Sequence, residues 1–97
     1  MPKGYMLSAH RKLADPEKAE AYRVLARPAL EAMGGKIIAA ADNIVAKESG
    51  RTERTVLIQF ESMAAAVAAY ESDEYKKALD VLEGGADRDI RLFEGLE

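Results

Sequence analysis

Four short segments of the chain have the alternating or continuous apolar pattern that is typical of β-strands. The most strand-like is 54–60, Arg-Thr-Val-Leu-Ile-Gln-Phe, because β-branched and aromatic residues favour extended backbone. Residues 5–10 alternate loosely, and 36–41 and 90–94 are short apolar-rich segments. Polar residues interrupt the second strand after position 41, and we expect it to bulge or bend there and resume at 44–47, with a tight hairpin as the alternative. The segment 54–60 should be a central strand.

A long helix is predicted between the first two strands. Asp15 can cap its start, Pro16 suits the first helical position, and Gly34-Gly35 should end it. Pro28 lies inside this helix and removes a backbone hydrogen-bond donor, so we expect a kink or short break near Arg27-Pro28. Apolar residues at helical spacing should form the buried stripe: Tyr22, Leu25, Ala26, Ala29 and Met33.

The second helical region follows the central strand. Ser62 can cap its start, and a second start at Ser72 predicts a break near Glu71-Ser72. Gly84-Gly85 should end it. The element order is then βαββαβ, which predicts a ferredoxin-like α+β fold: a four-stranded antiparallel sheet with strands one and three central and the helices on one face.

Period-two spacing divides the strand residues between two faces of this sheet. We expect the face toward the helices to carry Tyr5, Leu7, Ala9, Val56, Ile58, Phe60, Ile90 and Leu92. The opposite face would carry Met6, Ser8, His10, Thr55, Leu57, Gln59, Arg91 and Phe93. That second set is too apolar for full contact with water and too polar for a dry core. A homodimer joined through this sheet face, enclosing a partly polar cavity, would satisfy both conditions.

Composition limits the classes of function. Ninety-seven residues predict one domain, residues 1–97. The net charge is −3 with no basic stripe, which argues against nucleic-acid partners and anionic membrane surfaces. No segment has the apolar length of a signal peptide or a membrane span, so we expect a cytoplasmic protein. The absence of cysteine excludes disulfides, thiolate nucleophiles and sulfur-ligated metals.

His10 is the only histidine and the candidate catalytic residue. Its unperturbed pKa near neutrality suits a general acid or base, although a solvated position at the end of a strand is the alternative. A single histidine also argues against a metal site with several histidine ligands, and no carboxylate cluster has metal-ligand spacing. We therefore expect neither a metal nor another cofactor.

Four further residues are candidates for binding a small molecule: Tyr22, Arg54, Gln59 and Arg91. Tyr22 lies on the apolar stripe of the first helix, where the alternative is a core position with its hydroxyl at the edge. Arg54 and Arg91 lie on predicted strands, and either guanidinium could bind a carboxylate through its planar fork. The alternative for both arginines is an ion pair at the surface or at an interface.

Taken in order, several short motifs resemble the bacterial domain-of-unknown-function 1330 family. They are Gly4-Tyr5, Asp15-Pro16, Pro28-Ala29, Gly34-Gly35, the strand 56–60, the segment 64–70 followed by Ser72-Asp73-Glu74-Tyr75, and Glu94-Gly95. The resemblance implies a dimeric α+β barrel in which two ferredoxin-like sheets pack face to face. One departure is Met6, where many members carry a tryptophan.

The superfamily that the resemblance points to includes cofactor-free monooxygenases, muconolactone isomerases, haem-dependent peroxidases and ligand-sensing domains. It therefore implies a protein that binds a small organic molecule, with a cofactor-independent monooxygenase- or isomerase-like activity. The alternative is a non-catalytic homodimeric module for ligand sensing or protein interaction. An enzyme predicts that replacing His10 abolishes turnover while the fold survives. A non-catalytic module predicts that the same replacement has no effect.

Overall fold

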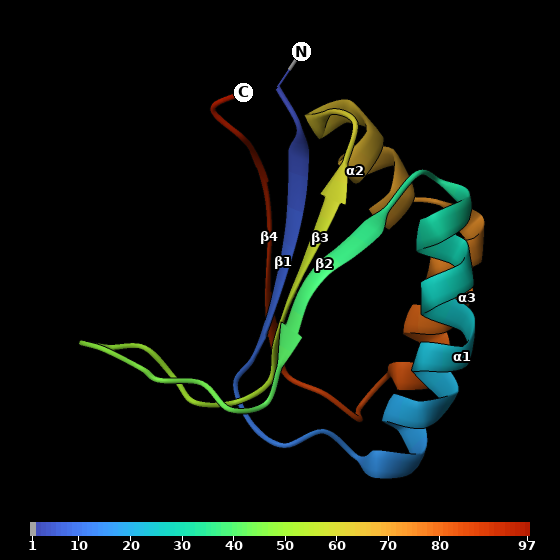
Figure 1. The fold of residues 1–97 in the computed structure, drawn as a ribbon. Helices are drawn as coiled ribbons and strands as arrows, with labels where there is room; N and C mark the ends of the chain where they lie inside the picture. Colours follow the sequence, from blue (N-terminus) through green and yellow to red (C-terminus); the bar gives the residue numbers. More distant parts are fainter. Residues whose placement is uncertain (1) are drawn as a thin grey trace.

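The computed structural model describes residues 2–97 and consists of two layers, a sheet and a group of helices (Figure 1). The antiparallel sheet has four strands: β1 (Gly4–His10), β2 (Lys36–Ala41), β3 (Thr55–Phe60) and β4 (Arg88–Glu94). Their order in the sheet is β2-β3-β1-β4, so β1 and β3 are central, as the sequence predicted. This confirms the ferredoxin-like α+β fold.

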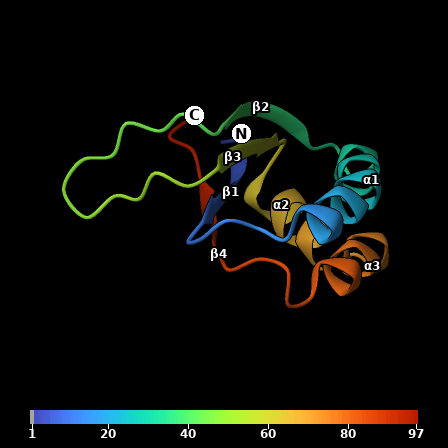
Figure 2. The same ribbon diagram turned by 90° about the horizontal axis from the view of Figure 1, so that it is seen from below.

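The three helices are α1 (Pro16–Ala32), α2 (Met63–Tyr70) and α3 (Asp73–Leu82), and all lie on one face of the sheet (Figure 2). Asp15 caps α1 by accepting hydrogen bonds from the backbone N–H groups of residues 17 and 18. Ser62 and Ser72 cap α2 and α3 in the same way. The break between α2 and α3 confirms the predicted split at residues 71–72, because a new cap there ends one helix and starts the next.

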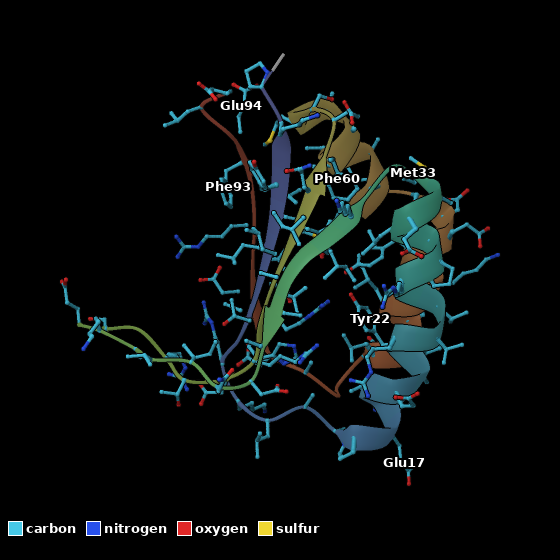
Figure 3. All side chains as sticks on the ribbon, viewed as in Figure 1. Glu17, Tyr22, Met33, Phe60, Phe93 and Glu94 are labelled. Carbon is cyan, nitrogen blue, oxygen red and sulfur yellow. The ribbon has the colours of Figure 1, made fainter. Side chains whose placement is uncertain are left out.

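The three helices do not cover the sheet equally. α2 packs directly on β1, β3 and β4, whereas α1 packs chiefly on α3. The fully buried centre of the molecule contains Met6, Phe60 and Tyr75. Phe60 points from β3 toward the helices, whereas Phe93 points away from them (Figure 3). The remaining core residues of the helices are mainly alanines, which allow α2 to approach the strands closely.

Two details of α1 differ from the prediction. The helix continues through Pro28 without a break, and the Pro28 ring lies on its exposed side. Leu25 and Met33 are each 40% exposed, whereas Leu30, outside the predicted stripe, is buried. The predicted stripe was therefore correct for Ala26, Ala29 and the half-buried Tyr22 and wrong for Leu25 and Met33, because α1 packs chiefly on α3.

The predicted face of β1 was also wrong. Met6 pairs with Ile58 on one side and Leu92 on the other, so Met6, Ser8 and His10 face the helices. Tyr5, Leu7 and Ala9 lie on the outer face instead. Neighbouring residues in β1 are apolar on both faces, and a shift of one residue exchanges the two sets. The faces predicted for residues 55–60 and 90–93 were correct.

The second strand ends at Ala41, and a bulge lies between Ile37 and Ala39. No strand resumes at residues 44–47, so the predicted continuation was wrong, and so was the tight-hairpin alternative. Residues 42–54 instead form a long connection that extends away from the two layers (Figure 1). Within residues 2–97, no helix has both the length and the apolar character needed to cross a membrane.

Candidate functional site

A cavity of about 740 Å³ lies between α1 and the inner face of the sheet, within the range of small-molecule sites. It exists because α2 fills the space over one end of the sheet, whereas α1 packs on α3 rather than on the strands. Its apolar walls come from one row of strand residues and from α1: Met6, Val56, Ile58, Ile37, Ala26 and Leu30.

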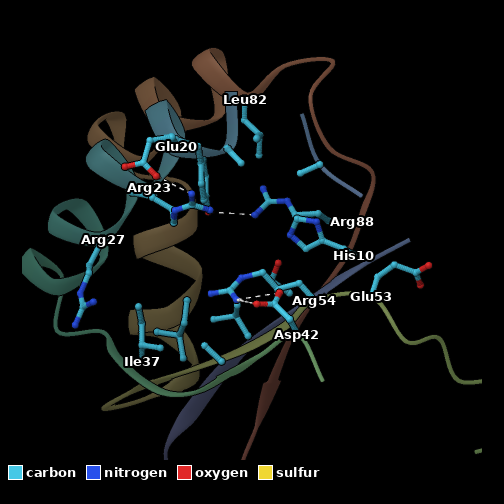
Figure 4. A pocket seen from close by; sticks show the side chains of 18 of the residues that line it. His10, Glu20, Arg23, Arg27, Ile37, Asp42, Glu53, Arg54, Leu82 and Arg88 are labelled. Carbon is cyan, nitrogen blue, oxygen red and sulfur yellow. Dashed lines mark hydrogen bonds and ion pairs between the residues drawn. The ribbon is translucent and has the colours of Figure 1, made fainter. Parts of the chain in front are cut away.

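One end of the cavity is polar because a charged or titratable residue lies there at the end of each strand or directly next to it (Figure 4). His10 ends β1 and pairs with Arg88, the first residue of β4. The backbone N–H of His10 donates to the carbonyl oxygen of Arg54, just before β3, at 2.9 Å. Arg54 in turn donates from one guanidinium nitrogen to both carboxylate oxygens of Asp42, after β2, at 3.1 and 3.2 Å.

Two tyrosine hydroxyls from the helix layer meet Arg88. The Tyr22 and Tyr75 hydroxyl oxygens are 2.6 Å apart. Arg88 Nη1 donates to the Tyr22 oxygen at 3.1 Å, and the guanidinium carbon lies 4.9 Å from the Tyr22 ring centroid. This placement gives a cation–π contact in addition to the hydrogen bond. Burial raises the pKa of Tyr75, so its hydroxyl keeps its proton at neutral pH.

The environment of His10 favours a neutral imidazole. Burial lowers its pKa, and the positive charges of Arg88 and Arg54 lower it further, while Asp42 opposes them. A neutral imidazole at the wall of a cavity can accept a proton from a bound molecule.

This gives a first prediction. Because His10 is the only histidine, an NMR titration of the wild-type protein follows one imidazole, and its midpoint should lie below about 6.5. The unfolded chain then binds more protons than the folded one as the pH falls through about 6.5, so the folded state loses stability there. A His10→Asn variant should lack this part of the pH dependence. A midpoint above 6.5 would contradict the prediction.

The structure brings together three of the five residues singled out from sequence. His10, Tyr22 and Arg54 all line the cavity. Gln59 and Arg91 lie on the outer face, away from it, and Arg91 is exposed and paired with Asp89 at 3.0 Å. For Arg91, the alternative of a surface ion pair therefore describes the structure.

Sequence reasoning missed Ser8, Asp42, Tyr75 and Arg88 as lining residues. Arg88 could have been found by extending the period-two pattern of Leu92 and Ile90 two residues back. No local pattern marks Asp42 or Tyr75, because they reach the cavity only through the packing of separate elements. Among residues 2–97, no three histidine, aspartate or glutamate side chains are grouped as they would be to hold a metal ion.

Comparison with known proteins places the chain in a family. The family described as domain of unknown function (DUF1330) matches residues 3–96. The chain belongs to this family. No curated protein matches this DUF1330 chain closely enough in sequence to count as a relative.

Solved structures resemble this DUF1330 protein in fold. A protein of unknown function from Rhodopseudomonas palustris has 18% identity and a TM-score of 0.75, with 99% of this chain and 84% of that one covered. A cofactor-independent oxygenase from Streptomyces nogalater, SnoaB, has 11% identity and a TM-score of 0.57, with 99% and 93% covered. A protein from Nitrosomonas europaea, described as a candidate antibiotic biosynthesis monooxygenase, has 18% identity and a TM-score of 0.55, with 98% and 90% covered. These identities support a shared fold only.

Proposed function

We propose that this protein binds a small organic molecule in the cavity between α1 and the sheet and removes a proton from it through His10, without a cofactor. The observation that carries this proposal is the imidazole of His10, held neutral at the wall of the cavity next to the guanidinium of Arg88. A neutral base and a fixed cation are the two groups that deprotonation of a carbon acid or a phenol requires.

The proposed chemistry is a transfer of the proton from the substrate to the imidazole of His10. The negative charge left on the substrate is spread onto an oxygen, which Arg88 stabilises. Return of the proton to another carbon would make the reaction an isomerisation. Reaction of the same anion with dioxygen would make it an oxygenation, and the description of SnoaB as a cofactor-independent oxygenase on this fold supports that route by analogy.

We also propose that the protein is a homodimer joined through the outer face of the sheet. The centre of that face carries Leu7 opposite Leu57, next to Tyr5 and Phe93, whose rings stack with centroids 5.8 Å apart. No helix within residues 2–97 covers this face (Figure 2). A two-fold axis would place the same apolar surface of a second copy against it.

The cavity-binding proposal predicts that native mass spectrometry of the protein, purified from its own host, finds extra mass on the wild-type chain. Val56→Phe should lose that adduct, because Val56 lines the cavity and a phenylalanine would occupy the space. Val81→Phe is the matched control, since Val81 is 38% exposed on α3 and lies outside the cavity lining. An adduct retained by Val56→Phe would contradict binding at this place.

The catalytic part is tested on the molecule so identified. Replacing His10 with asparagine should lower its turnover by about a hundredfold or more while binding and folding survive, as expected for loss of a general base. Binding without turnover in the wild-type protein would instead support the non-catalytic alternative, a ligand-sensing module.

A further inference from the structure

The net charge of the side chains that line the cavity is positive, whereas the net charge of the whole chain is negative. Five cationic side chains line it: Lys12, Arg23, Arg27, Arg54 and Arg88. Three carboxylates line it: Glu20, Asp42 and Glu53. The cavity therefore has an excess of positive charge, although the chain carries a net charge of −3. Such a local excess attracts anions.

Each carboxylate that lines the cavity forms an ion pair with an arginine other than Arg88. The pairs are Glu20 with Arg23 at 2.6 Å, Asp42 with Arg54 at 3.1 Å, and Glu53 with Arg51 at 3.2 Å. Arg88 is different, because none of the ion pairs found among residues 2–97 includes it. Its guanidinium is half-buried, and its side-chain partners are the hydroxyl groups of Tyr22 and Tyr75 rather than a carboxylate. A partly desolvated charge without a counter-charge leaves a place for an anion.

Counting the protons around Arg88 shows that this end of the cavity is rich in donors. One Arg88 N–H is used on the Tyr22 oxygen, and the guanidinium has four others. Tyr22 and Tyr75 have two hydroxyl protons but share a single hydrogen bond, so one proton remains to donate. Ser8 is buried in the cavity wall, and its hydroxyl is a further possible donor. A ligand that fits here must supply acceptors.

The rest of the cavity is apolar, so the two ends differ. Beyond Ser8, the inner face of the sheet continues with Met6, Ile58 and Ile37, and α1 contributes Ala26 and Leu30. An apolar body lying along these residues would leave water, which favours binding. The occupant that matches both ends has one anionic group and one compact apolar body.

We propose that the ligand of this cavity is an organic monocarboxylic acid whose carboxylate binds Arg88 and a tyrosine hydroxyl, and whose apolar part lies against Met6 and Ile58. This inference rests on the proposed function, since it names the class of molecule that the same cavity takes. A carboxylate matches the fork of an arginine through two parallel hydrogen bonds, and a charge-assisted pair of this kind is stronger than a neutral one.

The proposal also predicts a pH dependence through His10. A carboxylate bound at Arg88 offsets the positive charge that holds the pKa of His10 low, so binding should be accompanied by proton uptake. The other charged side chains that line the cavity around His10 are Lys12, Glu20, Arg23, Arg27, Asp42, Glu53, Arg54 and Arg88. Affinity for the acid should therefore rise as the pH falls through the pKa of His10.

The test compares two probes of the same shape, 1-naphthoate and its neutral amide 1-naphthamide, by calorimetric titration of the purified chain. The wild-type protein should bind the acid about tenfold or more tightly than the amide. Arg88→Met should remove this preference while binding of the amide survives, and Arg88→Lys should keep part of it. Arg91→Met is the matched control, because Arg91 is an exposed arginine on the outer face, and the preference should be unchanged.

Equal affinity for acid and amide, a preference that survives Arg88→Met, or no binding of the acid at millimolar concentration would each overturn the inference. Thermal melting of each variant shows that a lost preference is not a lost fold. The adduct measurement on the host-purified protein is independent of this comparison. If the adduct is a neutral molecule, the proposal of binding in the cavity still stands, and only the proposal that the ligand is a carboxylic acid is contradicted.

Discussion

Replacing Gly4 with alanine is expected to lower the free energy of unfolding by about 3 kcal/mol or more, the upper range for overpacking. A Cβ on Gly4 would overlap the carbonyl oxygen of Ser62 and lie 2.6 Å from the backbone nitrogen of Met63. These are backbone atoms at the start of α2, so no side-chain rotation relieves the overlap. Either β1 or α2 must move, and α2 is the helix that packs on the sheet. Chemical denaturation followed by circular dichroism measures the change.

Gly84→Ala is the control for this prediction. Gly84 has a φ of +76°, which disfavours alanine by roughly 1–2 kcal/mol, but the nearest atom to its Cβ would be Lys18 Nζ at 3.5 Å. Gly84→Ala should therefore lower the free energy of unfolding by less than Gly4→Ala does. Gly84→Ala opposes only a backbone preference, whereas Gly4→Ala creates a steric overlap with backbone atoms. Equal costs for the two variants would show that β1 and α2 separate more easily than their packing implies.

Replacing Leu57 with arginine is expected to convert the proposed dimer into a monomer. Leu57 lies in the middle of the outer face, between Leu7 on β1 and Ala39 on β2. In the proposed dimer it would be buried against the second copy, where an unpaired charge is strongly unfavourable. In the single chain it is only partly buried, and a long side chain can reach water. The mass in solution should fall from twice the chain mass of 10.6 kDa to 10.6 kDa.

Val81→Arg provides the comparison, because Val81 is exposed on the helix side of the molecule, away from the outer face. This variant should remain dimeric. Sedimentation or light scattering distinguishes the two masses. A monomeric wild-type protein, or a dimer that survives Leu57→Arg, would remove the outer face as the site of association.

The cavity and the outer face lie on opposite sides of the same sheet, so variants on the two sides should have different effects. His10, Arg54 and Arg88 face the helices, whereas Leu57 and Arg91 face outward. Variants of the first group should change ligand binding or turnover at constant mass. Variants of the second group should change association or nothing, and this separates the two proposals experimentally.

The elements of this fold were predictable because their signals are local. Asp15, Ser62 and Ser72 accept hydrogen bonds from backbone groups two or three residues ahead, so each cap is visible in a short window of sequence. The apolar segment of residues 56–60 likewise indicates a buried strand by itself. From such signals the element order followed, and the order of four strands and intervening helices fixed the ferredoxin-like topology.

The candidate site could be predicted only in part, because its residues come from distant points of the chain. Tyr22 and Arg88 are 66 positions apart and meet through a hydrogen bond that no sequence spacing encodes. Residues such as His10 and Arg54 were found because their chemical type is conspicuous. Asp42, Tyr75 and Arg88 were missed because each also suits an ordinary surface or core position.

The sequence by itself determined the order of helices and strands, the residues that cap the three helices, and which strands are central. Tertiary structure alone decided the face of β1, because Met6 and Leu7 are both apolar and only pairing with β3 and β4 selects which one is buried. Tertiary structure also decided that a cavity exists. It depends on α1 packing against α3 instead of the sheet, and that choice arises from the relative packing of whole elements, which no single segment contains.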